Sequence, residues 1–180
     1  MKRVWFGLAA VAIASALISC AGASTQSSSP NERVLATMDV GTVRAHDAST
    51  ADSTIEATPD VVFSAVAAAY QDLGIEVRFL NSTARQIGNK RFSKMYDLAG
   101  VHLSKYVGCG STETGPVADT YRVTMSIVSQ VTPSGTGSRV STQLTAYAED
   151  LGSSKGTLSC LTLGALEQRI NQLTVKHVGG

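Results

Sequence analysis

The chain has 180 residues, of which 43% are hydrophobic, 6% aromatic and 16% charged, and its formal net charge is +1. These values are typical of a globular protein with one domain, and they exclude disordered, collagen-like and polytopic membrane proteins. The charge is close to neutral and no block of basic residues stands out, so there is no electrostatic reason to expect nucleic-acid binding.

Residues 1–19 have the pattern of a secretory signal peptide. Lys2 and Arg3 form a basic start, and the stretch that follows carries no charge up to Ser19. This apolar run is shorter than the ~20 residues that a transmembrane helix needs. The sequence therefore predicts an exported protein.

The signal ends in Leu17-Ile18-Ser19-Cys20, which resembles the lipobox of bacterial lipoproteins. The resemblance implies cleavage before Cys20 and attachment of lipid to Cys20, and two or three acyl chains on one residue give stable membrane anchoring. Ala21 follows instead of an aspartate, which by the same resemblance implies the outer membrane, facing the periplasm, in a host with two membranes. An ordinary secretory signal with a chance cysteine is the alternative.

Residues 20–31 are small and polar, with no large apolar side chain, and they predict a lipidated flexible tether. Residues 32–180 are then expected to form a single domain. Without Lys2 and Arg3, 13 of the 15 basic residues stand against 14 acidic ones, so the mature chain has a formal charge of −1.

Two cysteines remain after Cys20, namely Cys109 and Cys160. An even number of thiols in an exported protein predicts a disulfide, and here only one pairing exists. The alternative is a reactive Cys109 thiol assisted by His102.

The first half of the domain predicts strands, a helix and a hairpin. Apolar residues alternate weakly over 33–40, a second short stretch surrounds Val43, and residues 45–52 are polar and expected to be loop. Thr58-Pro59-Asp60 supplies an N-cap hydroxyl, a proline and an acid, which predicts a helix from Pro59 to Leu73 that ends at Gly74.

After the helix, alternation at Ile75, Val77 and Phe79 predicts a strand that forms a hairpin with residues 85–92. Residues 95–106 fit a short helix or a strand equally well. Strict alternation over 121–127 and 140–148, with a turn at 133–137 between them, predicts an antiparallel hairpin with one polar face. Residues 157–161 predict a last edge strand, and residues 165–177 an amphipathic helix.

These elements predict an α+β domain in which two main helices pack on one face of an antiparallel sheet, with one disulfide. The element order and the long terminal helix resemble helix-grip domains, including those of the C lipoprotein of the outer-membrane barrel assembly machinery. The resemblance covers roughly residues 53–178 by pattern alone, and a shared fold does not transfer function.

No residue pattern specifies a reaction, a cofactor or a metal. The histidines are His46, His102 and His177, and none has the spacing of a zinc site. No hydrolase motif is present. We therefore expect no enzyme, although a cluster of His102, an unpaired Cys109 and a carboxylate would favour one.

One stretch combines basic and aromatic residues and is a candidate contact surface for a partner, because such residues supply much of the energy at interfaces. Its members are Arg85, Lys90, Arg91, Phe92, Tyr96 and Tyr106. Charged residues on the exposed face of a strand also need no such explanation.

Two functions follow as hypotheses. The first is a non-enzymatic, membrane-anchored envelope lipoprotein that acts through protein contacts, as a possible accessory of an envelope assembly. The alternative is a module that binds a small apolar ligand or lipid between sheet and helix. Its candidate lining residues are Phe63, Tyr70, Val123, Met125 and Leu144.

Overall fold

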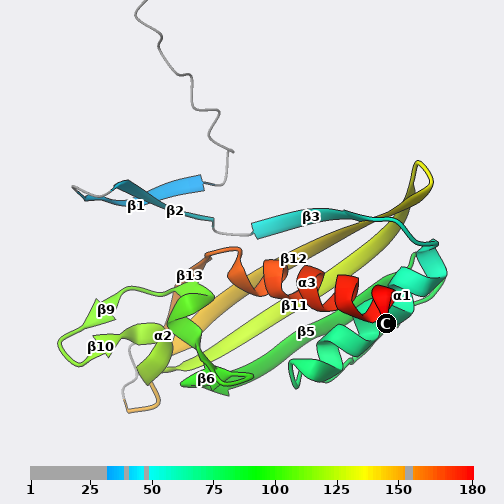
Figure 1. Cartoon of the computed structure of the whole chain (residues 1–180). Coiled ribbons are helices and arrows are strands. Elements are labelled where there is room, and N and C mark those ends of the chain that lie inside the picture. The colour runs from blue at the N-terminus through cyan, green and yellow to red at the C-terminus, as the bar shows by residue number, and fades with distance from the viewer. Residues whose placement is uncertain (1–31, 39–40, 47–48, 153–155) are drawn as a thin grey trace, which may run out of the picture.

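The computed structural model describes residues 32–38, 41–46, 49–152 and 156–180, with side chains from residue 51 onward. The predicted signal peptide, the predicted lipid attachment site Cys20 and the whole of the predicted tether (residues 20–31) lie outside the described residues. The described part is an α+β domain with an antiparallel sheet, as the sequence predicts (Figure 1).

Two long strands form the centre of the sheet. β11 (Arg122–Ser134) pairs with β12 (Gly137–Glu149) along their whole length, so the predicted hairpin is confirmed. The chain reverses at Gly135 and Thr136, and Gly135 has the positive φ (59°) that a tight hairpin turn requires. Every second residue is buried from Val123 to Val131 and from Ser138 to Ala148, because one face of the hairpin meets the helices.

The sheet continues on both sides of this hairpin. Its strand order is β1-β2-β13-β12-β11-β5-β4, with β3 also paired to β12 and β8 to β13. The bounds of these strands are β1 Glu32–Met38, β2 Gly41–His46, β3 Ser49–Ile55, β4 Phe79–Asn81, β5 Gln86–Met95, β8 Val107–Gly108 and β13 Thr157–Thr162. β1 and β2 agree with the two weak strand signals at 33–40 and around Val43.

Helix α1 (Pro59–Asp72) confirms the predicted helix within one residue. Thr58 has an extended backbone and is the N-cap, but its hydroxyl makes no capping hydrogen bond, so the expected role of that side chain is wrong. At the other end Gly74 adopts the left-handed conformation (φ 63°) that ends a helix.

Helix α3 (Ala165–Gly179) packs on α1, and both lie on the same side of β11 and β12 (Figure 1). Leu166 and Ile170 of α3 are completely buried, as are Val62, Val66 and Tyr70 of α1. They form one continuous core with the inward residues of the sheet, which is what holds the two layers together.

The stretch 95–106, for which the sequence left two readings, contains both kinds of structure. β6 (Asp97–Leu98) and β7 (Val101–His102) form a small hairpin, and a 3-10 turn, η1 (Leu103–Lys105), follows. β9 (Ser111–Thr112) and β10 (Gly115–Pro116) form a second hairpin, and α2 (Val117–Thr120) leads into β11.

Three expectations need correction. The polar segment 45–52 is largely strand, because β3 lies on the edge of β12 and needs no continuous apolar face there. The predicted strand over Ile75 to Phe79 begins only at Phe79. β13 is not an edge strand, since β8 and β2 pair with the side that β12 leaves open.

Candidate functional site

The outer edge of β5 is open over its second half. β4 pairs with β5 only from Gln86 to Gly88, whereas β11 follows β5 on the other side up to Met95. Among the described residues, no strand pairs with the outer edge of β5 beyond Gly88. An open strand edge presents backbone N–H and C=O groups that can pair with another chain.

The segment that joins α1 to β4 forms a wall beside this edge. Arg78 donates its backbone N–H to the Gly88 carbonyl (3.0 Å), and the Asn89 side-chain amide donates to the Glu76 carbonyl (2.9 Å). Asn89 is buried (2% exposed) and its Oδ1 accepts the Arg91 N–H (3.0 Å). The Asn89 side chain therefore fastens the wall to the strand and orders the start of the open edge.

A β-bulge changes the register of β5 at the same place. Asn89 lies opposite Ile127 and Phe92 lies opposite Met125, so both Lys90 and Arg91 face the single residue Ser126. A bulge bends a strand and redirects its side chains. It allows the side chains after it to turn towards the wall.

A groove of about 440 Å³ lies between the wall and the open edge. Its lining combines cations, one carboxylate, an amide and one aromatic ring, and consists of Gly74, Glu76, Arg78, Asn89, Arg91, Phe92, Ser93 and Lys94. We call this lining the β5 groove.

The charges of the β5 groove are unequal. Glu76 and Arg78 form an exposed ion pair (2.7 Å), whose hydrogen bond and attraction lower the pKa of the Glu76 carboxyl and raise the pKa of the Arg78 guanidinium. Arg91 and Lys94 have no carboxylate of the described chain within ion-pair distance. The groove therefore carries unneutralised positive charge.

The structure divides the predicted contact surface. Arg91 and Phe92 line the β5 groove, and Lys90 lies beside them with its ammonium 3.8 Å from the centre of the Phe79 ring. Tyr106 does not belong to any contact surface, because it is 2% exposed and accepts a hydrogen bond from Arg169. It faces inward because it packs in the hydrophobic core together with its chain neighbours Leu103 and Val107.

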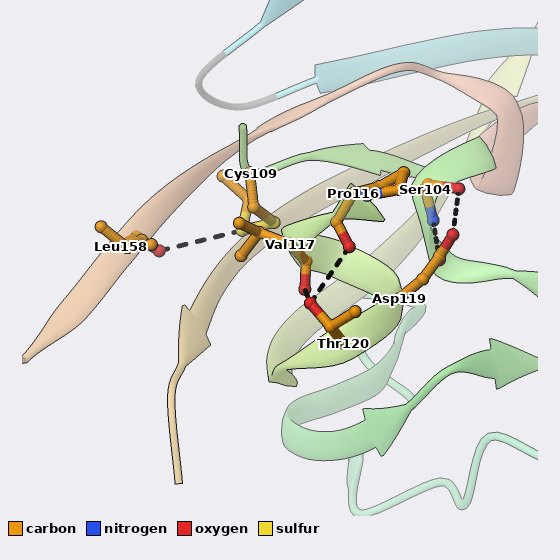
Figure 2. The surroundings of a disulfide bond; sticks show 8 residues. Ser104, Cys109, Pro116, Val117, Asp119, Thr120 and Leu158 are labelled. Carbon is orange, nitrogen blue, oxygen red and sulfur yellow. Dashed lines mark hydrogen bonds between the residues drawn. A yellow bond between two sulfur atoms is a disulfide. The ribbon is translucent and has the colours of Figure 1, made fainter. Parts of the chain in front are cut away.

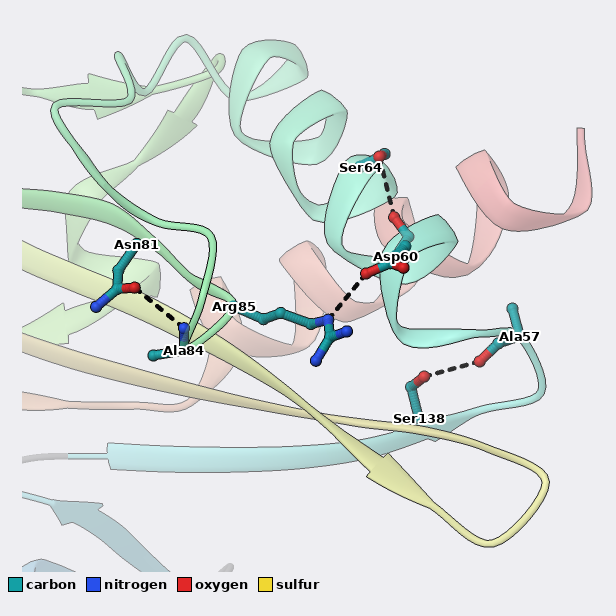
Figure 3. A network of polar contacts seen from close by, with 7 residues as sticks. All are labelled: Ala57, Asp60, Ser64, Asn81, Ala84, Arg85 and Ser138. Carbon is teal, nitrogen blue, oxygen red and sulfur yellow. Dashed lines mark hydrogen bonds and ion pairs between the residues drawn. The ribbon is translucent and has the colours of Figure 1, made fainter.

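Arg85 lies apart from the groove, at the turn between β4 and β5. Figure 3 shows its guanidinium directed at the N-terminus of α1, where Nε donates to Asp60 Oδ1 (2.9 Å). Nearby, Ser138 of β12 donates to the Ala57 carbonyl (2.7 Å), and Asn81 Oδ1 accepts the Ala84 N–H. Arg85 thus joins the turn to α1 and is not available to the β5 groove.

Tyr96 follows β5 directly and is half exposed, with the unusual positive φ of 71°. Its ring packs edge-on against His102 with 4.4 Å between ring centres. Asp119 Oδ2 lies 3.5 Å from His102 Nδ1. The same carboxylate accepts the N–H and the hydroxyl of Ser104 (Figure 2). His102 and a carboxylate do meet, but the third member of the reactive cluster considered above is bonded elsewhere.

That third member is Cys109, which forms a disulfide with Cys160, as the sequence predicts (Figure 2). The bond joins the loop after β8 to β13, and Cys160 is completely buried. In this form Cys109 has no free thiol. The disulfide therefore serves to fix the strand pair β8 and β13 at this end of the sheet.

In the part of the chain that the structure describes, His177 takes no part in a metal cluster. His177 Nε2 lies 2.9 Å from Asp72 Oδ2 and so connects the two main helices, while the side chain of His46 is not described. No group of three or more potential metal ligands occurs in the described chain. Within the same residues, no helix is long and apolar enough to cross a membrane.

The side chains proposed to line an apolar ligand pocket lie in the core. Tyr70, Val123, Met125 and Leu144 are at most 1% exposed, and Phe63 packs against them half-buried. None of them lines the β5 groove or the cavities found beside α1 and on the outer face of the sheet. The structure brings them together as packing partners.

Sequence reasoning missed the wall of the groove. Glu76 and Arg78 stood in the sequence as outward residues of an expected strand, and nothing linked them to residues 89–94. The one signal in the sequence was that Glu76 and Arg78 lie between the end of the predicted helix and the basic strand that follows. Comparisons with known proteins give no further guidance: no protein-family model, curated protein or solved structure matches the chain.

Proposed function

We propose that this protein is a lipoprotein of the bacterial cell envelope, anchored through Cys20, whose folded domain works by holding a protein partner at the β5 groove. The observation that carries the proposal is the open, basic edge of β5 beside a groove of about 440 Å³. The proposal assigns no reaction to the domain, and the partner belongs to an assembly of the envelope.

The rest of the chain supports this role. A lipid on Cys20 and the small polar residues up to Asn31 would confine the domain near a membrane while leaving it free to turn. Restriction to a surface raises the effective concentration of a weakly bound partner in the same membrane. The disulfide stabilises the domain in an oxidising compartment.

The composition of the groove is that of a contact surface. Arginine and aromatic residues are enriched at interface hot spots, and Arg91 and Phe92 are neighbours in its lining. No specific observation favours the apolar-ligand alternative, because its candidate residues are occupied with one another in the core.

Site-specific crosslinking in the native envelope tests the binding role. A photoreactive amino acid is placed at Ser93, in the groove, and in a second strain at Thr145, which is also exposed on a strand but lies on β12. We expect an adduct with one envelope protein from position 93 only, and we expect Arg91→Glu in the same chain to reduce it. Equal adducts at both positions, or none at position 93, would contradict the proposal.

The anchor is tested separately. Cys20→Ser should move the protein from the membrane fraction to the soluble fraction, whereas Cys109→Ser should leave it in the membrane. Retention of the Cys20→Ser variant in the membrane would show that the lipobox reading is wrong.

A further inference from the structure

We infer that the occupant of the β5 groove is an acidic segment of the partner protein in extended conformation, which adds a strand to the sheet along residues 90–95. This inference rests on the proposed function and names the chemistry of the partner. It follows from the backbone, the charge and the side chains of the groove, taken in turn.

The hydrogen-bonding groups of the open edge favour a polypeptide as the ligand. In a strand every second residue turns its N–H and C=O to the same edge, and Gly88 uses its outward carbonyl to accept from Arg78. Beyond that bond, Asn89 Oδ1 accepts the Arg91 N–H, and the described chain supplies no strand to the edge that follows. An extended peptide offers donors and acceptors at the matching spacing of roughly 3.3 Å per residue, which no compact ligand does.

The charge of the groove selects carboxylates. Arg91 and Lys94 line it without an acidic partner in the described chain, and Lys90 is exposed beside them. Glu76, the single acid of the lining, is already held by Arg78. A segment rich in Asp or Glu would neutralise these cations, whereas a basic segment would be repelled.

The same charges argue against a second copy of this chain as the occupant. Pairing of two β5 edges would bring Lys90, Arg91 and Lys94 of both copies together, and like charges across a strand pair are destabilising. Lysines and bulges at open edges are known protections against such self-pairing. An acidic strand from a different protein can pair with this edge without such repulsion.

The far end of the edge provides apolar contacts. Met95 and Tyr96 are both 55% exposed, and the half-buried Phe92 lies within the groove. Alternate side chains of an added strand would point towards these groups, while the residues between them would point away. The expected partner segment therefore alternates acidic and apolar residues.

An anionic lipid headgroup or a free phosphate would also meet the positive charge. Neither of these anions would form hydrogen bonds with the open backbone edge. Binding that depends on the peptide N–H groups of the ligand therefore indicates an added strand, and binding that depends on negative charge alone indicates a simple anion. The test is built on that difference.

The experiment measures binding of synthetic peptides to the full lipidated protein in mild detergent by fluorescence anisotropy. The probe is a labelled ten-residue peptide of alternating Glu and Val. Its controls are the same peptide with every second amide N-methylated and a peptide of alternating Lys and Val. N-methylation removes the hydrogen-bond donors from one edge of the peptide but keeps the negative charge of its Glu side chains.

We expect the Glu-Val peptide to bind and the N-methylated and Lys-Val peptides to bind at least about tenfold more weakly. The double variant Arg91→Glu and Lys94→Glu should lose about tenfold in affinity, more at low salt than at high salt. Arg139 is an exposed cation on β12 away from the groove, so Arg139→Glu should change the affinity for the Glu-Val peptide little.

Three outcomes would overturn the inference. Equal binding of the N-methylated peptide would show a site for anions without strand addition. Displacement of the probe by phosphatidylglycerol added to the detergent micelles, or by inorganic phosphate at similar concentration, would assign the groove to those anions. If no peptide binds while the photoreactive residue at position 93 still crosslinks to an envelope protein, the strand-addition inference fails and the proposed function stands. If neither peptide binding nor crosslinking is observed, the proposed function fails as well.

Discussion

The hydroxyl of Tyr70, on α1, lies 3.1 Å from Ser129 Oγ, on β11, and neither residue is accessible to solvent. Ser129 Oγ lies in turn 2.7 Å from Thr142 Oγ1 on β12. A chain of three hydroxyl groups therefore runs from the helix across the two central strands. Buried hydroxyls stabilise a fold only when they are paired, so this chain specifies where α1 sits on the sheet.

Tyr70→Phe should lower the free energy of unfolding by about 1–2 kcal/mol, because it removes one buried hydrogen bond and keeps the ring. Urea unfolding followed by circular dichroism measures the change. Tyr147→Phe is the control: Tyr147 is partly exposed on the opposite face of β12, and its hydroxyl has no partner among the described residues. A loss as large in the control would show that the buried chain is not the cause.

The same residue predicts a loss of stability in alkali. Burial is the main cause that raises the pKa of the Tyr70 phenol, and the charge of Glu167 adds to it. Unfolded tyrosine loses its proton near pH 10, whereas folded Tyr70 keeps it, so the unfolded state binds fewer protons above that pH. The contribution of Tyr70 to the free energy of unfolding is therefore complete below about pH 10. Above that pH it declines by up to about 1.4 kcal/mol per pH unit.

Unfolding free energies measured from pH 8 to pH 11 check this prediction. Tyr70→Phe should show a shallower decline above pH 10 than the parent protein, while Tyr147→Phe should follow the parent. Identical slopes for all three proteins would mean that Tyr70 ionises in the folded state as readily as in the unfolded chain.

The disulfide should supply a large part of the stability of the domain. Cys109 and Cys160 are separated by 51 positions, and closing a loop of that length restricts the unfolded chain by about 4 kcal/mol on the chain-entropy model. The double variant Cys109→Ala and Cys160→Ala should lose about that amount in urea unfolding. A reductant should destabilise the parent protein and leave the double variant unchanged.

Gly137→Ala should weaken the pairing of β3 with β12. A Cβ atom at Gly137 would collide with the Ile55 carbonyl oxygen, so the two strands would have to separate. We expect a loss of about 1–3 kcal/mol in the free energy of unfolding. Gly135→Asn is the matched control in the same turn, since Gly135 has open space around it and asparagine tolerates its positive φ. Equal losses in both variants would contradict this account.

Ala99→Gly should stabilise the protein. Ala99 and Gly100 form the two-residue turn between β6 and β7, with φ of 53° and 73°, and alanine disfavours that region. We expect a gain of about 0.5–1 kcal/mol. The same substitution at Ala67, within α1, should cost about 1 kcal/mol, so opposite signs in one unfolding experiment would identify the backbone conformation as the cause.

Particular residues show why some of the fold was readable from the sequence. Thr58-Pro59-Asp60 and Gly74 mark the ends of α1 through local backbone preferences, although the Thr58 hydroxyl proved unnecessary. The alternation in β11 and β12 follows from one buried and one exposed face. Ser49 to Ile55 gave no such signal, because an edge strand beside β12 needs only a few buried positions.

The candidate site depended more on tertiary structure. The sequence showed that residues 85–96 are basic and aromatic, but it could not separate Arg85, which is paired with Asp60, from Arg91, which has no such partner among the described residues. It also grouped the buried Tyr106 with exposed residues.

By itself the sequence determined the two main helices, the central hairpin and the partners of the disulfide, because each depends on a local pattern or on a single possible pairing. Export and anchoring through Cys20 stay predictions from the sequence. The tertiary structure decided which strand edge stays open, how Glu76 and Arg78 stand beside Arg91 and Lys94, and which hydroxyls meet in the core. These contacts join residues that are distant in sequence. They are determined by how the helices pack on the sheet and not by the intrinsic backbone preference of any one residue.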